Sequence, residues 1–216
     1  MPTFAAILPA GGASRRFGRN KLTEVLAGQT VLWRSVQAFA CRRDVPVVLV
    51  AGPVHVDAAK VRNMPGGRCR AETVRNALAG VPAQIEWVAV HDAARPLVSQ
   101  ALIDRVLIAA VEHGAAAPAL PVTLTIKQCR GPLPAPVIRT IPRGELWAMQ
   151  TPQILRRSAL LDAYSRCPIP LDEVTDDVQL LEMTGQSVTL VEGEDRNLKI
   201  TRPEDLPLAE FFLGAG

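Results

Sequence analysis

The sequence predicts an α/β protein built on a doubly wound, mainly parallel β-sheet from which a β-arm projects. Apolar runs typical of buried strands alternate with helical patterns along the chain, and this alternation favours parallel strands. Strands such as Val45–Val50 are almost continuously apolar, as expected for a sheet that is covered on both faces. The length of 216 residues fits a single domain over residues 1–216 with a substantial core.

The sheet and its first helices follow from local patterns. Strands are expected at four apolar runs, Phe4–Leu8, Val45–Ala51, Trp87–His91 and Ala115–Leu120. Between them, capping residues precede three helical patterns: Thr30 before Val31–Ala40, Thr73 before Val74–Ala79, and Ser99 before Ala101–Glu112. Ligands of such sheets bind beyond the carboxyl ends of the strands, so the functional site is expected there.

Residues 121–145 interrupt this alternation. The segments Val122–Lys127 and Val137–Ile141 have strand patterns, and the proline-rich Gly131–Pro136 connects them. An isolated two-stranded ribbon is only marginally stable in water. We therefore expect a β-arm that packs on another surface, and a second subunit is the natural candidate.

The last third of the chain returns to α/β patterning. Thr175–Gly185 has a capping residue, early acidic residues and a terminal glycine, which together predict a complete helix. Val188–Val191 is expected to be a strand. Thr201 and Glu204 have the spacing of a capping box, so a closing helix is expected to run from there to about Phe212.

Composition narrows the class of partner. The formal net charge of +3 is too small to argue for nucleic acid or a membrane surface, and few aromatic residues are available to stack on bases. The four cysteines show no C-x-x-C spacing, which favours free thiols in a reducing compartment. The N-terminus does not resemble a signal peptide, and no apolar stretch approaches the roughly 20 residues of a membrane span. We expect a cytoplasmic protein.

A glycine-rich, basic loop follows the first strand. In Pro9–Lys21, Gly11 and Gly12 allow close approach of the backbone to a ligand. The cationic side chains of this loop, which suit a triphosphate, are Arg15, Arg16, Arg19 and Lys21. The pattern is neither that of a P-loop nor that of a dinucleotide-binding loop. The loop is interpreted as a phosphate-binding loop; a tight turn with solvated arginines is the alternative.

Other segments carry weaker signals. Asp92 follows a buried strand beside small alanines, where a carboxylate can hold Mg²⁺ together with substrate phosphates. Alternatively, Asp92 caps the next turn and pairs with Arg95, while His91 is interpreted as a core residue. Gly66–Thr73 suits an anion or a base edge, although an ordinary loop and helix cap explain it as well. Lys199 stands before a helix, where it can meet a phosphate.

Taken together, these motifs resemble a known family in order and over essentially the whole chain. The matching segments are Pro9–Lys21, Arg70-x-x-Thr73-Val, Val90–Pro96, Thr125–Lys127, Trp147-x-x-Gln-Thr-Pro-Gln153, Thr175–Asp177 and Asn197-x-Lys-x-Thr-Arg-Pro-Glu-Asp205. They are similar to the 2-C-methyl-D-erythritol 4-phosphate cytidylyltransferases of non-mevalonate isoprenoid biosynthesis. The opening loop is shared by many nucleotidyltransferases, whereas the segments that begin at His91, Gln150 and Lys199 make the resemblance to this narrower family strong.

The resemblance implies a Rossmann-like nucleotidyltransferase fold and transfer of CMP from CTP to 2-C-methyl-D-erythritol 4-phosphate, with release of pyrophosphate. It implies that Arg16, Lys21 and Lys199 are catalytic and that Asp92 holds Mg²⁺. The nucleotide-binding residues would be Ala10, Gly11, Gly12, Gly67, Thr73 and Ala93. The acceptor would bind to Arg95, Thr125, Arg143, Thr151 and Thr175, some of them from the partner in a homodimer formed through the arm at about residues 121–145.

The chain departs from the family pattern at three places. Leu124 stands where the arm usually has an aspartate, Asn20–Leu22 replaces the usual Pro-Lys-Gln in a shortened loop, and Arg68 replaces an acidic residue. Two alternatives remain open: a different polyol phosphate acceptor such as ribitol 5-phosphate, and a non-catalytic nucleotide-binding domain. The presence of Lys21, Asp92 and Lys199, together with Arg16, argues against the second, because a mere binding domain does not need all four.

Overall fold

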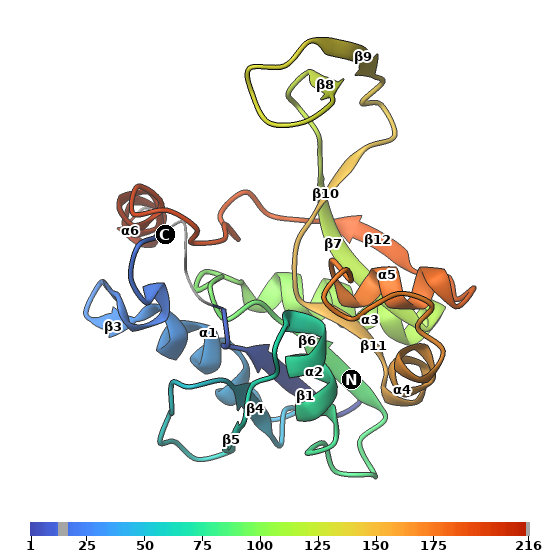
Figure 1. Cartoon of the computed structure of the whole chain (residues 1–216). Helices are drawn as coiled ribbons and strands as arrows, with labels where there is room; N and C mark the ends of the chain where they lie inside the picture. Colours follow the sequence, from blue (N-terminus) through green and yellow to red (C-terminus); the bar gives the residue numbers. More distant parts are fainter. Residues whose placement is uncertain (13–16, 215–216) are drawn as a thin grey trace.

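A computed structural model describes residues 1–12 and 17–214 of the chain, and its centre is a mixed eight-stranded sheet (Figure 1). The strands run in the order β10–β7–β11–β6–β1–β4–β5, and β12 pairs with β7. Their bounds are β1 Phe4–Pro9, β4 Val48–Ala51, β5 Val61–Met64, β6 Trp87–Val90, β7 Ala115–Pro121, β10 Trp147–Met149, β11 Gln153–Arg156 and β12 Thr189–Glu192. The predicted α/β class with a mainly parallel sheet is therefore confirmed.

Parallel pairing dominates the half of the sheet around β1. β1 pairs in parallel with β4 and β6, β4 pairs in parallel with β5, and β12 pairs in parallel with β7. β10 and β11 are antiparallel to their neighbours. The strand predicted at Val45–Ala51 begins in the structure only at Val48. Pro46 has no N–H to contribute to the ladder, which explains the later start although Val45 and Val47 are buried.

The helices cover both faces of the sheet, as the doubly wound prediction requires. Side chains alternate along β1: Phe4, Ala6 and Leu8 enter one apolar core and Ala5 and Ile7 the other. The first core receives α1 Val31–Ala40, α3 Gln100–His113 and α6 Asp205–Gly214, and the second receives α2 Arg70–Leu78, α4 Arg157–Ser165 and α5 Asp177–Met183. The apolar continuity of the central strands follows from this two-sided burial.

Two predicted helix caps are confirmed. The Thr30 hydroxyl accepts a hydrogen bond from the Trp33 N–H at 3.1 Å, and the Ser99 hydroxyl accepts one from the Leu102 N–H at 2.9 Å. The helices they cap, α1 and α3, begin at Val31 and Gln100. A hydroxyl in this position satisfies one of the unpaired N–H groups of the first helical turn.

Three other helix starts were predicted incorrectly. Cys69, not Thr73, caps α2, because its Sγ already accepts from the Glu72 N–H and helix α2 has begun by Arg70. Asp176 caps α5 in place of Thr175. α6 starts at Asp205, whose carboxylate accepts hydrogen bonds from the Thr201 N–H and hydroxyl; the expected capping-box partner Glu204 does not take this role, and the helix continues to Gly214, beyond the predicted end.

The predicted arm is present as a separate antiparallel hairpin that projects from the sheet (Figure 1). Its strands are β8 Ile126–Cys129 and β9 Val137–Ile141. The first begins later than predicted, because residues 122–125 form the stalk that leads out of β7; the Val122 N–H donates to the Leu146 carbonyl at the base of the arm. Apolar side chains on the stalk and hairpin are highly exposed: Leu124, Leu133, Val137 and Ile138 at 76%, 79%, 60% and 53%.

Two further sequence expectations concern cysteines and helices. All four cysteines lie in the described part of the chain and are free thiols, as expected. Across residues 1–12 and 17–214, none of the helices combines the length and the apolar character needed to cross a membrane. A short hairpin, β2 Val25–Leu26 with β3 Gln29–Thr30, follows the one-turn helix η1 Lys21–Thr23 and leads into α1.

Candidate functional site

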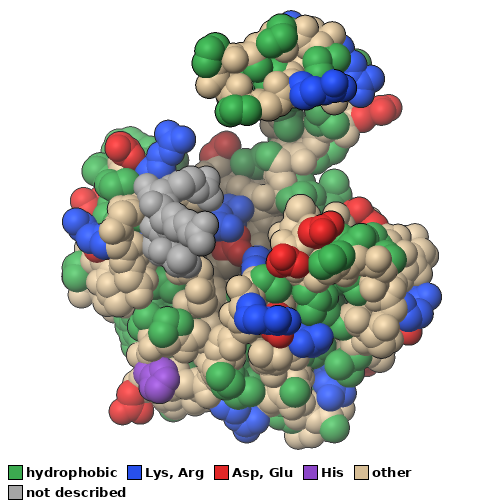
Figure 2. Space-filling view, in the orientation of Figure 1, with side chains coloured by type: hydrophobic (Ala, Val, Ile, Leu, Met, Phe, Trp, Pro, Cys, Tyr) green, Lys and Arg blue, Asp and Glu red, His purple; other side chains and the backbone are tan. Residues whose placement is uncertain are grey.

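A cavity of about 290 Å³ opens at the carboxyl ends of β1 and β6, where ligands of parallel sheets usually bind. Figure 2 shows it as a hollow in the middle of one face, with basic and acidic side chains on its floor. Its lining residues are Pro9, Gly11, Gly12, Lys21, Leu22, Gly67, Arg68, Cys69, Arg70, Thr73, Asp92, Ala93, Ala94 and Lys199. Residues from widely separated segments of the chain therefore meet at one place.

The glycine-rich wall of the cavity is tightly built. The Ala10 N–H donates to the Ala51 carbonyl at 2.7 Å, which places the buried Ala10 just behind the lining residues. A Cβ on Gly52 would lie only 2.5 Å from the Ala10 carbonyl carbon, so glycine is required for this approach. Arg15 and Arg16 belong to residues 13–16, outside the described part of the chain.

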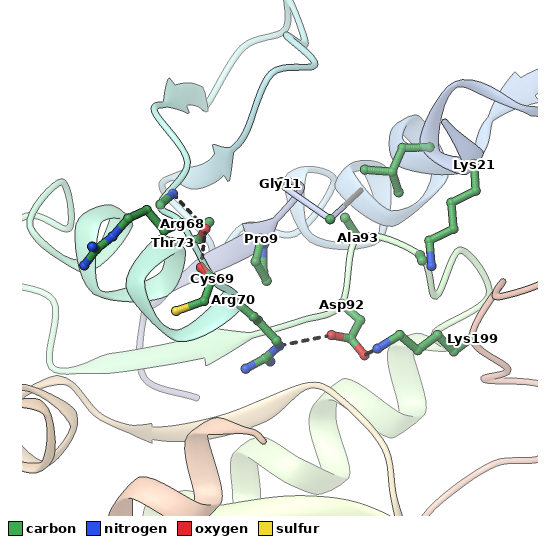
Figure 3. A pocket seen from close by; sticks show the side chains of 14 residues that line it. Pro9, Gly11, Lys21, Arg68, Cys69, Arg70, Thr73, Asp92, Ala93 and Lys199 are labelled. Atoms are coloured by element: carbon green, nitrogen blue, oxygen red, sulfur yellow. Dashed lines mark hydrogen bonds and ion pairs between the residues drawn. The ribbon is translucent and has the colours of Figure 1, made fainter. Parts of the chain in front are cut away.

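A second wall is formed by the segment before α2. The Gly67 N–H donates to the Thr73 hydroxyl at 2.9 Å, and that hydroxyl donates to the Cys69 carbonyl at 2.8 Å. A Cβ on Gly67 would lie 2.6 Å from Glu72 Cγ, so the loop can fold against α2 only with glycine here. Thr73 is thus a cavity residue that shapes the loop from within the helix. The unusual Arg68 pairs with Glu72 at 3.0 Å, and Figure 3 shows its side chain directed away from Asp92.

Asp92 is the centre of an ion-pair cluster on the cavity floor (Figure 3). Its Oδ2 lies 2.9 Å from Lys199 Nζ and 3.4 Å from Arg95 Nε, and its Oδ1 lies 3.5 Å from Arg70 Nε. The alternative in which Asp92 pairs with Arg95 is thus part of the arrangement but not the whole of it. Lys21 faces the same cavity, with its side chain directed towards the side on which Asp92 and Lys199 lie.

The electrostatic balance of this cluster favours a bound anion. Burial alone would raise the pKa of Asp92, but Lys199, Arg70 and Arg95 together lower it well below its usual range. The carboxylate is therefore ionised throughout the neutral pH range. Three cations contact Asp92, and Lys21 adds a fourth cation to the cavity wall. Arg70 is also paired with Asp177, so four cations stand against two carboxylates. Such a local excess of positive charge attracts phosphate groups.

His91 and Thr151 hold the backbone of Asp92. The Asp92 N–H donates to the Thr151 hydroxyl at 3.0 Å, and that oxygen lies 3.0 Å from His91 Nδ1. His91 is fully buried, and burial lowers its pKa to about 4, so the ring is neutral at pH 7. Its Nε2 lies 3.1 Å from the Arg95 carbonyl, which can only accept, so Nε2 carries the proton and Nδ1 accepts from Thr151. The interpretation of His91 as a satisfied core residue is confirmed.

A second cavity of about 320 Å³ adjoins the first and shares Arg70, Asp92 and Lys199 with it. Its other lining residues are Arg95, Met149, Gln150, Thr151, Gln153, Thr175 and Asp176. Three of the predicted acceptor residues, Arg95, Thr151 and Thr175, are therefore brought together. The other two, Thr125 and Arg143, belong to the arm and line neither cavity; the Arg143 guanidinium donates to the Thr123 carbonyl.

Some residues that build the site had no role assigned from the sequence. Arg70 lies between both cavities and is paired with Asp177 at 2.8 Å. The Gln150 side chain binds the loop before Lys199: its amide donates to the Glu194 carbonyl at 2.9 Å and accepts from the Glu194 N–H at 3.1 Å. Both Arg70 and Gln150 lie inside motifs noted above, but nothing in the sequence distinguishes them from their neighbours.

These features define the class of protein: a doubly wound α/β protein with a cavity lined by several cations at the carboxyl ends of its parallel strands. The model of the family described as 2-C-methyl-D-erythritol 4-phosphate cytidylyltransferase (IspD) matches residues 4–215. The chain belongs to this family.

Curated relatives and solved structures agree with this assignment. The 2-C-methyl-D-erythritol 4-phosphate cytidylyltransferase of Frankia casuarinae is 40% identical over 222 residues, which are 98% of this chain and 82% of the relative. The bifunctional enzyme IspD/IspF of Anaeromyxobacter dehalogenans is 40% identical over 97% of this chain, but the chain spans only 56% of that relative.

Two solved structures match this chain over almost the full length of both chains. The crystal structure of 2-C-methyl-D-erythritol 4-phosphate cytidylyltransferase from Thermus thermophilus has a TM-score of 0.82 and 36% identity, covering 98% of each chain. The corresponding Francisella tularensis structure has a TM-score of 0.85 and 30% identity, covering 97% of this chain and 99% of that one. The architecture described above is that of the family.

Proposed function

We propose that the chain transfers CMP from CTP to 2-C-methyl-D-erythritol 4-phosphate, giving 4-diphosphocytidyl-2-C-methyl-D-erythritol and pyrophosphate. The observation that carries the proposal is the cluster of Asp92 with Lys199, Arg70 and Arg95 between two adjoining cavities. One cavity has glycine-rich walls that suit a nucleotide, and the other offers hydroxyl groups and a cation that suit a polyol phosphate. Membership of the family supports the assignment of the two substrates.

The first cavity is proposed to bind CTP. Its small residues would let backbone groups of the glycine-rich walls approach the base closely, and these close walls would admit a pyrimidine and exclude a purine. The residues proposed for the cytidine are Ala10, Gly11, Gly12, Gly67, Thr73 and Ala93. Lys21 and Lys199 supply positive charge for the triphosphate, as does Arg16, which lies outside the described residues.

A magnesium ion is proposed to bind together with CTP, because the family is Mg²⁺-dependent. Among the described residues, no group of three or more His, Cys, Asp and Glu side chains could hold a metal ion. Among the described residues that line the first cavity, Asp92 is the one carboxylate, which fits Mg²⁺, since this ion is commonly held by one or two carboxylates and substrate phosphates. The ion would neutralise charge on the triphosphate. Phosphates that draw Lys199 and Arg70 towards themselves would free the carboxylate oxygens for this role.

The second cavity is proposed to bind the acceptor through Arg95, Thr151 and Thr175. Thr125 and Arg143 would complete the acceptor site from the arm of a partner subunit, because both lie on the arm and line neither cavity of their own chain. The proposed homodimer is supported by the exposed apolar side chains of the arm, which a partner surface would bury.

The chemistry requires positioning more than covalent participation of the protein. An oxygen of the acceptor phosphate attacks the α-phosphorus of CTP in line, the bond from that phosphorus to the oxygen bridging the β-phosphate breaks, and pyrophosphate leaves. A phosphate monoester has a second pKa of about 6 and is already a nucleophilic anion at neutral pH, so no general base is needed. Lys21, Lys199 and Arg70, which line the first cavity, would stabilise the charge that develops on the phosphoryl oxygens.

The test is release of pyrophosphate from purified protein with CTP and Mg²⁺, with either 2-C-methyl-D-erythritol 4-phosphate or ribitol 5-phosphate as the acceptor. Release with the first acceptor alone is the expected result. Release with ribitol 5-phosphate alone would agree with the proposed mechanism but would show that the proposed acceptor is wrong. Absence of release with both, in folded protein that still binds CTP by calorimetry, would identify a non-catalytic nucleotide-binding domain. A reaction without any acceptor controls for hydrolysis of CTP.

A further inference from the structure

Two residues outside the proposed chemistry surround the guanidinium of Arg70. Arg70 Nη1 lies 2.8 Å from Asp177 Oδ2, although the two residues are 107 positions apart in the chain. The Tyr164 hydroxyl lies 2.9 Å from the Ala71 carbonyl and 3.4 Å from Asp177 Oδ1, and it can donate its one proton to either acceptor. The first turns of α2 and α5 and the last turn of α4 are therefore linked at this point.

Asp177 is itself held firmly. Its side chain is 1% exposed, and the N–H groups of Asp177 and Val178 both donate to Gln153 Oε1, at 3.0 and 3.2 Å. Burial raises the pKa of Asp177, and the guanidinium of Arg70 opposes that rise. An ion pair at such a depth adds little net stability, because desolvation offsets most of the attraction. What the pair does provide is a fixed direction for the guanidinium.

The direction given to Arg70 is functionally specific. With Nη1 bound to Asp177, the Nε edge faces Asp92 Oδ1 at 3.5 Å. Nη2 donates no hydrogen bond to any residue in the described part of the chain, and Arg70 lines both cavities. A planar guanidinium with one nitrogen uncommitted is suited to bind a phosphate oxygen.

We propose that Asp177, supported by Tyr164, is a positioning residue that aims the guanidinium of Arg70 at a phosphate oxygen between the nucleotide and acceptor cavities. The proposal rests on the function proposed above. Without the Asp177 charge, Arg70 would turn towards Asp92, its remaining anionic partner, and would neutralise Asp92 in place of the substrate phosphate. Substrate binding by the other groups would remain, so the loss should fall on kcat rather than on the KM for CTP.

A double-mutant cycle tests whether Asp177 acts through Arg70. Asp177→Asn keeps the shape of the side chain and the backbone contacts to Gln153. We expect it to lower kcat at least tenfold with the KM for CTP changed less than threefold. In an Arg70→Met background the same substitution should change kcat less than twofold. Equal losses in both backgrounds would overturn the proposal, because Asp177 would then act independently of Arg70.

Controls separate positioning from folding. Asp162→Asn on α4 removes an exposed carboxylate paired with Arg166 at 2.5 Å and should leave kcat unchanged. Tyr164→Phe, which removes one hydroxyl, should lower kcat about threefold with native circular dichroism and should have no effect in the Arg70→Met background. It serves as the decisive variant if Asp177→Asn does not fold. An unchanged kcat in Tyr164→Phe would show that Tyr164 does not help to position Arg70.

A readout without turnover distinguishes this proposal from the proposed function. The Arg70 Nε–H signal in ¹⁵N-labelled protein, assigned by its absence in Arg70→Met, should exchange with solvent at least tenfold faster in Asp177→Asn than in the native protein. The native protein could release no pyrophosphate while the Nε–H exchange of Arg70 is still faster in Asp177→Asn. The proposed function would then be wrong, whereas the positioning of Arg70 by Asp177 would be supported. An unchanged exchange rate would overturn the positioning whatever the activity.

Discussion

Replacing Asp92 by asparagine should destabilise the protein, because it removes the anion that three cations share. The side chains of Asp92 and Arg95 are each 11% exposed, and Arg70 is 26% exposed, so this part of the cluster is largely buried. Lys199 is 38% exposed, and its pair contributes at most about 1 kcal/mol. Removing one partner of a buried pair costs about 3–5 kcal/mol. We expect a loss of about 3 kcal/mol, which corresponds to a decrease in Tm of about 6–12 °C for a chain of this size.

The assay is urea denaturation followed by circular dichroism at pH 7 and at pH 3. The pKa of Asp92 is lowered in the folded protein, so its stabilisation is complete above the unfolded value of about 3.9 and is lost as the pH falls further. The difference between native and Asp92→Asn protein should therefore be full at pH 7 and smaller once the pH falls below the unfolded value. A variant as stable as the native protein at pH 7, or more stable, would refute the reasoning.

Three further predictions concern the loop, the wall and the arm. Lys21→Ala should lower kcat/KM in the pyrophosphate assay at least about 100-fold, roughly 2.7 kcal/mol of transition-state stabilisation, and native-like rates would contradict its role. Gly52→Ala places a methyl group 2.5 Å from the Ala10 carbonyl carbon and should cost about 1–3 kcal/mol in urea unfolding, whereas Gly144→Ala, in open space, should be neutral. Leu133→Asp should shift the proposed dimer towards monomer in sedimentation velocity; an unchanged distribution would exclude this contact.

The parts of the fold that were predictable are those decided by local pattern. The alternation along β1 sends Phe4 and Ile7 into opposite cores, and that two-sided burial is visible in the sequence as a continuous apolar run. β5 could be indicated only as a strand-like region before Gly66, without bounds, because Arg62 and Asn63 are exposed on an edge strand with no apolar pattern. β10 and β11 were not predicted, because these short strands form through their pairing with β7 and β6. That pairing joins distant parts of the chain and leaves no local pattern in the sequence.

Within the site, the charged residues could be predicted from local pattern, whereas the distances between them could not. Asp92 after a strand and Lys199 before a helix could be identified because chain position predicts their approach to the sheet edge. The distance of 2.9 Å between Lys199 Nζ and Asp92 Oδ2 could not be predicted, because it depends on Gln150, which holds the loop that carries Lys199. Thr73 was predicted to cap the helix α2. Cys69 caps this helix instead, and the Thr73 hydroxyl accepts a hydrogen bond from the Gly67 N–H.

Gln150 shows why neutral residues determine whether the charged ones meet. A Cβ on Gly193 would lie 2.6 Å from Gln150 Oε1, so the loop after β12 packs directly against this amide, and Asn197 Nδ2 reaches the same oxygen at 3.3 Å. The Asn197 carbonyl in turn accepts from Arg95 Nη1 at 2.7 Å. One uncharged side chain therefore fixes the loop from which Lys199 approaches Asp92 and through which Arg95 is oriented. The precision of the cluster therefore derives in part from this neutral framework of hydrogen bonds, which sets where the charged side chains start from.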